Sequence, residues 1–291
     1  ARTRRPPPPP PSERDASQLR FATRWWRGRL EPHGIAVEDL PHAFRAAVVP
    51  LQLAELLTGF TPHAFHPVPV SRRECITNLE AFLALVRAAG VAVVGGVGGA
   101  RADEAKEVRR LAGLLADGDP PTIVNVTWAL MLRFDICADG ASAGEAMVDL
   151  LRWAKASTRG YAGVEIHETR TAWSRCFGDG LALCAVLHAH GHKMLSYDAM
   201  LQAGRRARFS TVVRVASDVL RVPSLCTAED FLQEGGVEPR MLIAYLSALR
   251  RALKLALPDE VRRQESIDHL SRLLRSHSHA KLGQVSRQRR A

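Results

Sequence analysis

Histidine side chains with the chemistry for metal binding or proton transfer alternate at one place in the chain. His188, His190 and His192 stand two residues apart. A helix would not carry all three on one face, because neighbours on a helical face lie three or four residues apart. No paired cysteine or carboxylate accompanies them to complete a metal-ligand set. We therefore expect neither a metal site nor a cofactor at these histidines.

Two further stretches could serve catalysis or nucleotide binding, and both favour structural roles. Asp179 is the one acid in the sequence GDG at 178–180, and we interpret it as a helix-start residue rather than a catalytic base. The glycine-rich stretch at 89–99 precedes a helical pattern, as in a dinucleotide-binding turn. Such a turn needs a third small residue three positions after Gly98, where Arg101 stands, and no repeated β-α units follow. We predict a surface loop there and no enzyme.

Arginine spacing near the N-terminus points to a binding surface instead. Arg20, Arg24 and Arg27 occur at i, i+4 and i+7, so a helix would display them as one basic stripe. An ordinary solvated face is the alternative. The chain carries a net charge of +10, of which residues 1–30 hold +6 and residues 259–291 hold +4. Basic ends attract nucleic acid, an anionic membrane or an acidic protein polymer without selecting among them.

The segment from Ile123 to Ile136 predicts a helix that is covered almost all round. Its polar residues are Asn125, Thr127, Arg133 and Asp135, which do not share one helical face. The side chains that we expect to face the core are Val124, Trp128, Met131 and Leu132. Those left on the outer side are Ile123, Val126, Thr127 and Leu130. Such an apolar patch would mark a partner surface, unless the loop at 95–113 or a second domain buries it.

Helical periodicity runs through the rest of the chain, and strand patterns are nearly absent. The helical patterns lie at 18–30, 39–59, 72–90, 101–116, 123–136, 145–158, 179–191, 209–220 and 239–257. The order of the first half repeats after a short segment of small residues at 137–144. We predict an all-α fold with two similar domains in tandem, 18–136 and 145–257, with Trp25 and Trp153 in their cores. Each would be a compact bundle of about four main helices plus short ones.

The two ends are expected to lie outside these domains. Residues 1–17 are predicted to be a disordered basic arm, since the prolines Pro6–Pro11 can form neither helix nor sheet. This proline run is predicted to be a ligand of an SH3 domain or of profilin. The alternative is that it only keeps the protein soluble. Residues 258–291 would be a basic helical or disordered tail. No apolar run reaches the roughly 20 residues of a membrane span, and five cysteines without a CxxC pair favour a reducing cytosol.

Six segments, in the correct order, resemble the paired calponin-homology (CH) domains of α-actinin, spectrin and related actin crosslinkers. In the first half they are DLPHAFRAAVVPLQLAELLTG (39–59) and DGDPPTIVNVTWALMLRFDI (117–136). In the second half they are LRWAKASTRGYAGVEI (151–166), DGLALCAVLHAH (179–190), YDAM (197–200) and MLIAYLSAL (241–249). The resemblance implies two CH domains that bind the side of F-actin, in the cytoplasm and on the cytoskeleton, with no catalytic activity and no specific nucleic-acid target.

The resemblance also implies which residues meet actin. In this family the contacts come from the first and last helices of the first domain and from the first helix of the second. The corresponding candidates are Arg20, Thr23, Arg24, Arg27, Ile123, Val126, Thr127, Leu130, Arg152 and Lys155. Regulation by phosphoinositide, as in α-actinin-like members, would use Lys155, Arg159 and Arg170.

Four departures from the family pattern keep an alternative open. Ala46 and Ala47 replace the usual Asp-Gly, and Asn125 replaces a small Gly. The loop at 95–113 is longer than the family's, and an insertion near 171–180 leaves either Trp173 or Phe177 for the aromatic pocket. The alternative is a CH-domain scaffold for microtubule or signalling partners that does not bind actin. A second rival is polyanion binding through the basic ends alone.

Overall fold

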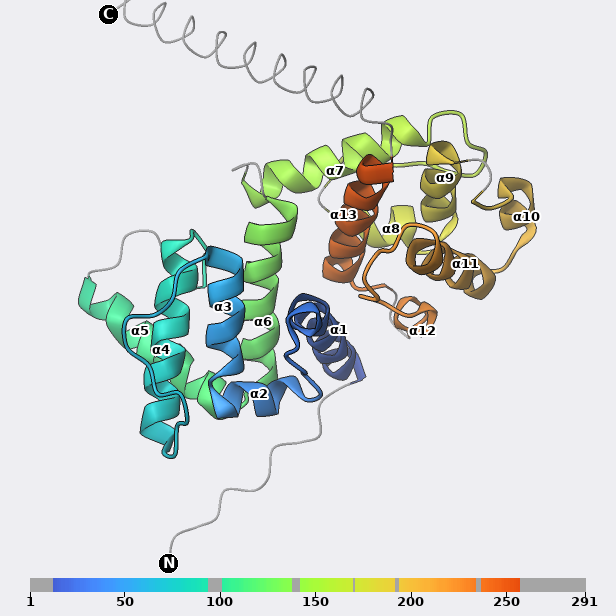
Figure 1. Cartoon of the computed structure of the whole chain (residues 1–291). Helices are drawn as coiled ribbons and strands as arrows, with labels where there is room; N and C mark the ends of the chain where they lie inside the picture. Colours follow the sequence, from blue (N-terminus) through green and yellow to red (C-terminus); the bar gives the residue numbers. More distant parts are fainter. Residues whose placement is uncertain are drawn as a thin grey trace, which may run out of the picture. The chain divides into compact units, whose positions relative to one another are not determined.

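A computed structural model describes residues 13–93, 101–137, 142–169, 171–191, 194–233 and 237–256. The predictions for the proline run Pro6–Pro11, for Arg170, for His192 and for the tail after residue 256 lie outside the described residues. The chain divides into two compact units, Ala1–Ala248 and Leu249–Ala291. Within the described ranges every regular element is a helix and no strand is present, so the all-α prediction is confirmed (Figure 1).

The N-terminal half of the larger unit is built from six α-helices and two short helical turns. They are α1 (Glu13–Leu30), η1 (Glu31–His33), α2 (Leu40–Ala46), α3 (Val49–Thr58), α4 (Arg72–Ala88), α5 (Arg101–Ala116), α6 (Pro120–Met131) and the π-helical turn η2 (Leu132–Ile136). An aromatic cluster forms its core: the ring centroid of Trp26 lies 5.0 Å from Phe44 and 6.3 Å from Phe82. Trp25 is also buried, as predicted.

The C-terminal half continues with α7 (Ala143–Ser157), α8 (Trp173–Phe177), α9 (Leu181–His190), α10 (Tyr197–Gln202), α11 (Arg205–Asp218), α12 (Ala228–Phe231) and α13 (Pro239–Ala256). Phe231 stacks on Phe209 at 4.7 Å and meets Tyr245 edge-on at 5.4 Å. The sequence left open whether Trp173 or Phe177 occupies the aromatic pocket. Both side chains are buried, and their ring centroids lie 5.8 Å apart in a stacked arrangement. Both rings therefore belong to the core of this half.

Local side chains set where several helices begin. Ser71 accepts a hydrogen bond from the Glu74 amide, and the Glu74 carboxylate accepts one back from Ser71, which forms a capping box at the start of α4. Ser142 and Glu145 do the same for α7. Asp119 accepts from the Thr122 amide at 3.0 Å, and Pro120 fits the first turn of α6 because proline has no amide hydrogen to leave unpaired.

The structure corrects three predicted boundaries. Residues 13–17 belong to α1 rather than to a disordered arm, because Glu13 and Asp15 favour the positive end of the helix dipole. Residues 101–113, predicted both as part of a helical pattern and as part of a long loop, belong to α5, as their Ala, Glu and Arg content favours. The single helix predicted over 39–59 is two helices, because Ala47 takes a left-handed conformation at φ 57° and ends α2.

Candidate functional site

The predicted outer face of α6 is buried, so that part of the candidate site is wrong. Ile123, Thr127 and Leu130 have exposed fractions of 0%, and Val126 has 2%. Trp26 on α1 donates a hydrogen bond from Nε1 to the Thr127 hydroxyl at 2.9 Å, which allows this polar side chain to sit in the core. A helix that is apolar nearly all round does not fix its own rotation. The packing of α1 and α5 against α6 decides it.

The side chains expected in the core of α6 lie on its outer side, with one exception. Met131 is buried as predicted, but Val124, Trp128 and Leu132 are half-buried. Arg240 at the start of α13 donates from Nη1 to Asn125 Oδ1 at 3.0 Å, and its guanidinium lies 5.6 Å from the Trp128 ring centroid. The outer face of α6 therefore meets the C-terminal half.

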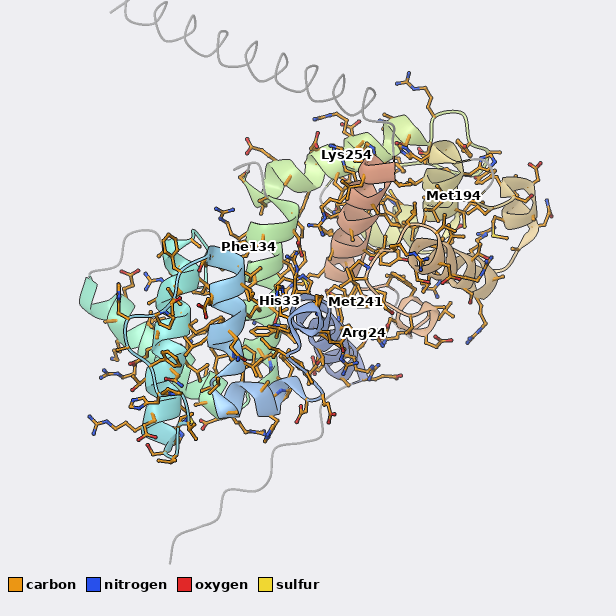
Figure 2. The ribbon with its side chains drawn as sticks, in the orientation of Figure 1. Arg24, His33, Phe134, Met194, Met241 and Lys254 are labelled. Carbon is orange, nitrogen blue, oxygen red and sulfur yellow. The ribbon has the colours of Figure 1, made fainter. Side chains whose placement is uncertain are left out.

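The arginine stripe of α1 does not act as one uniform basic surface. Arg20 is exposed. Arg24, labelled in Figure 2, forms an ion pair with Asp230 of α12, so its side chain is engaged by the C-terminal half. Arg27 donates to the Val37 carbonyl at 2.9 and 3.1 Å.

Two further side chains of α1, Thr23 and Arg14, are also engaged by other groups of the protein. Thr23 is half-buried and donates its hydroxyl hydrogen to the Leu19 carbonyl at 2.8 Å. Arg14, at the exposed start of α1, pairs with Glu238 of the C-terminal half. Of the predicted contact residues on α1, Arg20 thus lies on the open surface, and Arg27 keeps 41% of its side chain exposed while it pairs with Glu31 at 3.4 Å.

A buried carboxylate, which the sequence analysis did not single out, ties α1 to the end of α6. Asp135 accepts a hydrogen bond from Trp25 Nε1 at 2.6 Å and pairs with Arg29. The Arg29 guanidinium also lies 5.5 Å from the Trp25 ring centroid. Ser247 donates its hydroxyl hydrogen to the Asp135 backbone carbonyl at 3.1 Å. Asp135 stands 110 residues from Trp25 in the chain, so no local sequence signal could have found the pair.

The basic residues of α7 face a carboxylate. Lys155 Nζ lies 3.1 Å and Arg152 Nε 3.5 Å from the Glu168 carboxylate. The hydrogen bond from Lys155 and the nearby positive charges lower the pKa of Glu168, so it is ionised at neutral pH. Arg159 is exposed at the edge of a shallow pocket that Glu165 and Glu168 also line. An anionic ligand would have to compete with these carboxylates for Lys155.

The α9 histidines make structural contacts. His188 Nδ1 lies 2.8 Å from the Tyr161 hydroxyl, and His190 Nε2 lies 3.1 Å from the Ser157 hydroxyl. Trp153 is half-buried rather than fully in the core, and it stacks on His190 at 5.6 Å. In the described part of the chain, no three His, Cys, Asp or Glu side chains gather in a way that would hold a metal ion.

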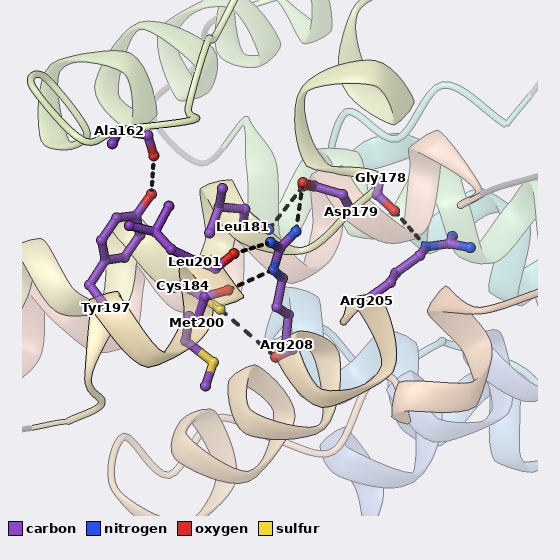
Figure 3. Close-up of polar contacts among 10 residues, drawn as sticks. All are labelled: Ala162, Gly178, Asp179, Leu181, Cys184, Tyr197, Met200, Leu201, Arg205 and Arg208. Carbon is purple, nitrogen blue, oxygen red and sulfur yellow. Dashed lines mark hydrogen bonds and ion pairs between the residues drawn. The ribbon is translucent and has the colours of Figure 1, made fainter. Parts of the chain in front are cut away.

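Asp179 sits beside the start of α9, as predicted. Its Oδ1 accepts a hydrogen bond from the Leu181 amide at 3.0 Å, and its Oδ2 accepts one from Arg208 at 2.9 Å (Figure 3). Arg208 also donates to the carbonyls of Met200 and Leu201 at 2.9 and 3.1 Å. The sequence analysis missed Arg208 because its carbonyl partners carry no side-chain signal.

No helix that the structure describes has the length and apolarity needed to cross a membrane.

Comparison with known proteins identifies the class of the second half. Residues 145–254 match the family model of the Calponin homology (CH) domain. Over 244 residues the chain is 26% identical to Alpha-actinin-3 of Mus musculus, which covers 82% of this chain and 24% of that protein. Over 236 residues it is 25% identical to Alpha-actinin A of Dictyostelium discoideum, which covers 80% of this chain. The chain thus spans about a quarter of the length of these relatives.

A solved structure agrees in fold. The actin-crosslinking core of Schizosaccharomyces pombe fimbrin superposes with a TM-score of 0.61 at 15% identity, covering 81% of this chain and 48% of that one. Residues 145–254 are therefore a CH domain. The predicted resemblance to the α-actinin type of CH region is confirmed.

Proposed function

We propose that the chain is an F-actin-binding module of a cytoskeletal crosslinker or linker protein, located in the cytoplasm on the cytoskeleton. It would comprise two CH domains, 18–136 and 145–257, joined at 137–144. One observation carries this proposal: the similarity to α-actinin-3 extends over 82% of the chain, well beyond the CH match at 145–254. The function would be binding and not catalysis.

We propose that basic side chains on two helices contribute to filament binding. Arg20 on α1 is exposed, and Arg152 and Lys155 are exposed on α7. Arg20 would contribute most. The other basic side chains would contribute less, because Asp230, the Val37 carbonyl and Glu168 already engage the charged groups of Arg24, Arg27, Arg152 and Lys155. Contacts between exposed charges weaken as salt rises, so we expect salt-sensitive binding.

Co-sedimentation with F-actin and with microtubules tests this function. We expect the wild-type chain to pellet with F-actin and to bind more weakly as salt is raised. Arg20→Glu should lower the affinity about threefold to tenfold, since it reverses a charge at an exposed contact. Arg206→Glu on α11, also strongly exposed, is the matched control and should bind like the wild type. Pelleting with microtubules alone would instead support the scaffold function.

We also propose two secondary partners of the chain. Phosphoinositide would bind Lys155, Arg159 and Arg170, in competition with Glu168. An SH3 domain or profilin would bind Pro6–Pro11. Vesicle co-sedimentation tests the first partner and a pull-down with the full chain tests the second.

A further inference from the structure

One hydroxyl side chain of the N-terminal half combines exposure, an irregular backbone and a following proline. Thr61 precedes Pro62, and this is the one Ser-Pro or Thr-Pro pair in the sequence. Thr61 is exposed and lies outside the helices, in the connection between α3 and α4 (Figure 1). The F-actin contacts proposed above do not use it. These features together are what a protein kinase needs at an acceptor residue.

The chain is accessible on both sides of Thr61. Phosphoryl transfer needs the acceptor oxygen in line with the γ-phosphorus of ATP, so the neighbours of the acceptor must also enter the kinase cleft. Gly59 and Phe60 before Thr61 are exposed, and so are residues 63–66, while Pro62 is half-buried. Residues 59–66 lie outside the helices, so a kinase reaches the hydroxyl without unfolding one.

The neighbouring hydroxyl groups lack this combination of features. Thr58 is half-buried in α3 and donates its hydroxyl hydrogen to the Ala54 carbonyl at 2.7 Å. Thr77 is exposed but lies inside α4. Ser71 is exposed but caps α4, where its hydroxyl accepts from the Glu74 amide at 3.3 Å. Between residues 58 and 77, Thr61 is thus the accessible hydroxyl that lies outside helices and their caps.

Pro62 indicates which class of kinase would act on this hydroxyl. Proline has no amide hydrogen, so it enters an apolar pocket without leaving a backbone donor unpaired. Any other residue after the acceptor would bring an amide hydrogen that such a pocket leaves without an acceptor. A kinase with an apolar pocket at this position therefore selects Thr61 through Pro62. This is the recognition chemistry of a proline-directed serine/threonine kinase.

Thr61 is held by a carboxylate whose interaction a phosphate would reverse. Its Oγ1 donates to Glu55 Oε1 at 2.6 Å, and the Gly59 amide donates to the Glu55 carbonyl at 2.8 Å. A phosphate near a helix C-terminus or beside a carboxylate is repelled. Position 61 meets both conditions, because α3 ends at Thr58 and Glu55 is in direct contact. The nearest basic residue in the sequence is His63.

We propose that Thr61 is a phosphorylation site for a proline-directed serine/threonine kinase, and that the phosphate releases the residues after α3 from Glu55. In the transfer, Thr61 Oγ1 forms a bond to the γ-phosphorus of ATP, the bond from that phosphorus to the β,γ-bridging oxygen breaks, and ADP leaves. The hydroxyl proton passes to the catalytic aspartate of the kinase. The product carries about two negative charges at neutral pH and has lost the hydrogen that Glu55 accepted.

Incubation of the full chain with a purified mitogen-activated protein kinase and Mg-ATP tests the site. We expect mass spectrometry to find phosphate at Thr61, and Pro62→Ala to lower the rate of incorporation there about tenfold or more. Circular dichroism establishes that this variant is folded. A synthetic peptide of residues 55–67 shows whether the kinase recognises the sequence without the fold. If Thr61 of the native chain takes up no phosphate, with or without labelling of the peptide, the proposed site is overturned.

Release from Glu55 has a separate readout, the thermal midpoint of unfolding. Phosphorylation should lower the midpoint of the wild type by roughly 1–3 °C and speed hydrogen exchange at the amides of residues 59–61. Glu55→Gln is the matched variant, in which the phosphate should lower the midpoint by less than half as much. Equal shifts in the two, zero included, would overturn the release. Neither measurement involves F-actin, so the site and the proposed function fail or stand separately.

Discussion

Ala47 occupies a backbone conformation that normally favours glycine. Its φ is 57°, it ends α2, and its amide donates to the carbonyls of Ala43 and Phe44. The Cβ of an L-residue crowds the following carbonyl in this region, at a cost of roughly 1–2 kcal/mol. The pattern that this part of the sequence resembles has Gly at this position, so the departure noted in the sequence has a structural consequence.

We expect Ala47→Gly to change the stability by less than about 0.5 kcal/mol. Relief of about 1–2 kcal/mol of left-handed strain is offset by the loss of one buried methyl group, worth about 0.8 kcal/mol, and by the entropy cost of glycine, about 0.5–1 kcal/mol. Denaturant unfolding monitored by circular dichroism measures the change. Ala46→Gly is the control: Ala46 is exposed and lies in the last turn of α2, so glycine there relieves no strain and should destabilise by about 0.5–1 kcal/mol. A loss in Ala47→Gly larger than that in Ala46→Gly would contradict this account.

The five cysteines differ strongly in accessibility. Cys75 is half-buried on α4, whereas Cys184 and Cys226 are fully buried. Burial raises the pKa of the Cys184 thiol to about 12, because the thiolate is disfavoured away from water. Below that pH Cys184 stays protonated, and only the thiolate reacts readily with alkylating agents.

Iodoacetamide at mildly alkaline pH should therefore label Cys75 in the native protein well before Cys184 and Cys226. Mass spectrometry of peptides after timed quenching gives the order, and labelling in denaturant is the control in which all five react. Equal rates for Cys75 and Cys184 in the native state would show that α9 opens far more often than its packing indicates.

At the scale of elements, one arginine joins three helices of the CH domain. Arg208 on α11 donates to two carbonyls at the end of α10 and to Asp179 before α9, and its side chain is only 14% exposed. Both carbonyls, those of Met200 and Leu201, lie in the last turn of α10, where helical amides run out; the Met200 carbonyl also accepts a hydrogen bond from the Ala203 amide at 3.3 Å. Arg205 donates to the Gly178 carbonyl at 2.7 Å (Figure 3) and to the Phe231 carbonyl at 2.6 Å.

Replacement of Arg208 by Leu should cost about 2 kcal/mol of unfolding free energy, because it removes the side-chain donor of the Leu201 carbonyl and the partner of Asp179. Arg206→Leu, on the same helix, removes only an exposed pair with Glu229 at 3.4 Å and should change stability by less than about 0.5 kcal/mol. Urea unfolding of both variants decides the question. Similar losses for the two would mean that the Arg208 contacts carry little net energy.

At the scale of the whole molecule, the net charge lies at the ends of the sequence. Between residues 31 and 258 the acidic and basic residues balance. If F-actin binding comes from specific surfaces of the helical body, the terminal charges should mainly speed encounter and add weak attraction.

Deletion of residues 1–12 and 259–291 should thus weaken F-actin binding only on the order of threefold at physiological salt. It should also make binding less sensitive to salt, as co-sedimentation across a salt series would measure. A deletion that stops at residue 12 leaves α1 intact, so it should not lower the stability of the N-terminal half. Complete loss of pelleting would place the affinity in the basic ends.

The sequence by itself determined the class of the fold and the position of most helices. Period-3.6 patterns, Gly59 at the end of α3 and the Ser71–Glu74 cap are local signals, and local hydrogen bonding reproduces them in the structure. Their order along the chain also carried the resemblance to CH domains. Burial of Trp25, too, followed from its place in the pattern.

Only the tertiary structure decided which side of each helix is available to a partner. The rotation of α6 depends on Trp26 bonding Thr127, and the engagement of Arg24 depends on Asp230, a residue 206 positions away. Such contacts are set by packing between distant segments, and an all-round apolar helix or an evenly spaced arginine stripe is compatible with several arrangements. The same reason hid the exposure of Phe60, Val68 and Val70, because exposure of an apolar side chain is a property of its surroundings and not of its own residue type.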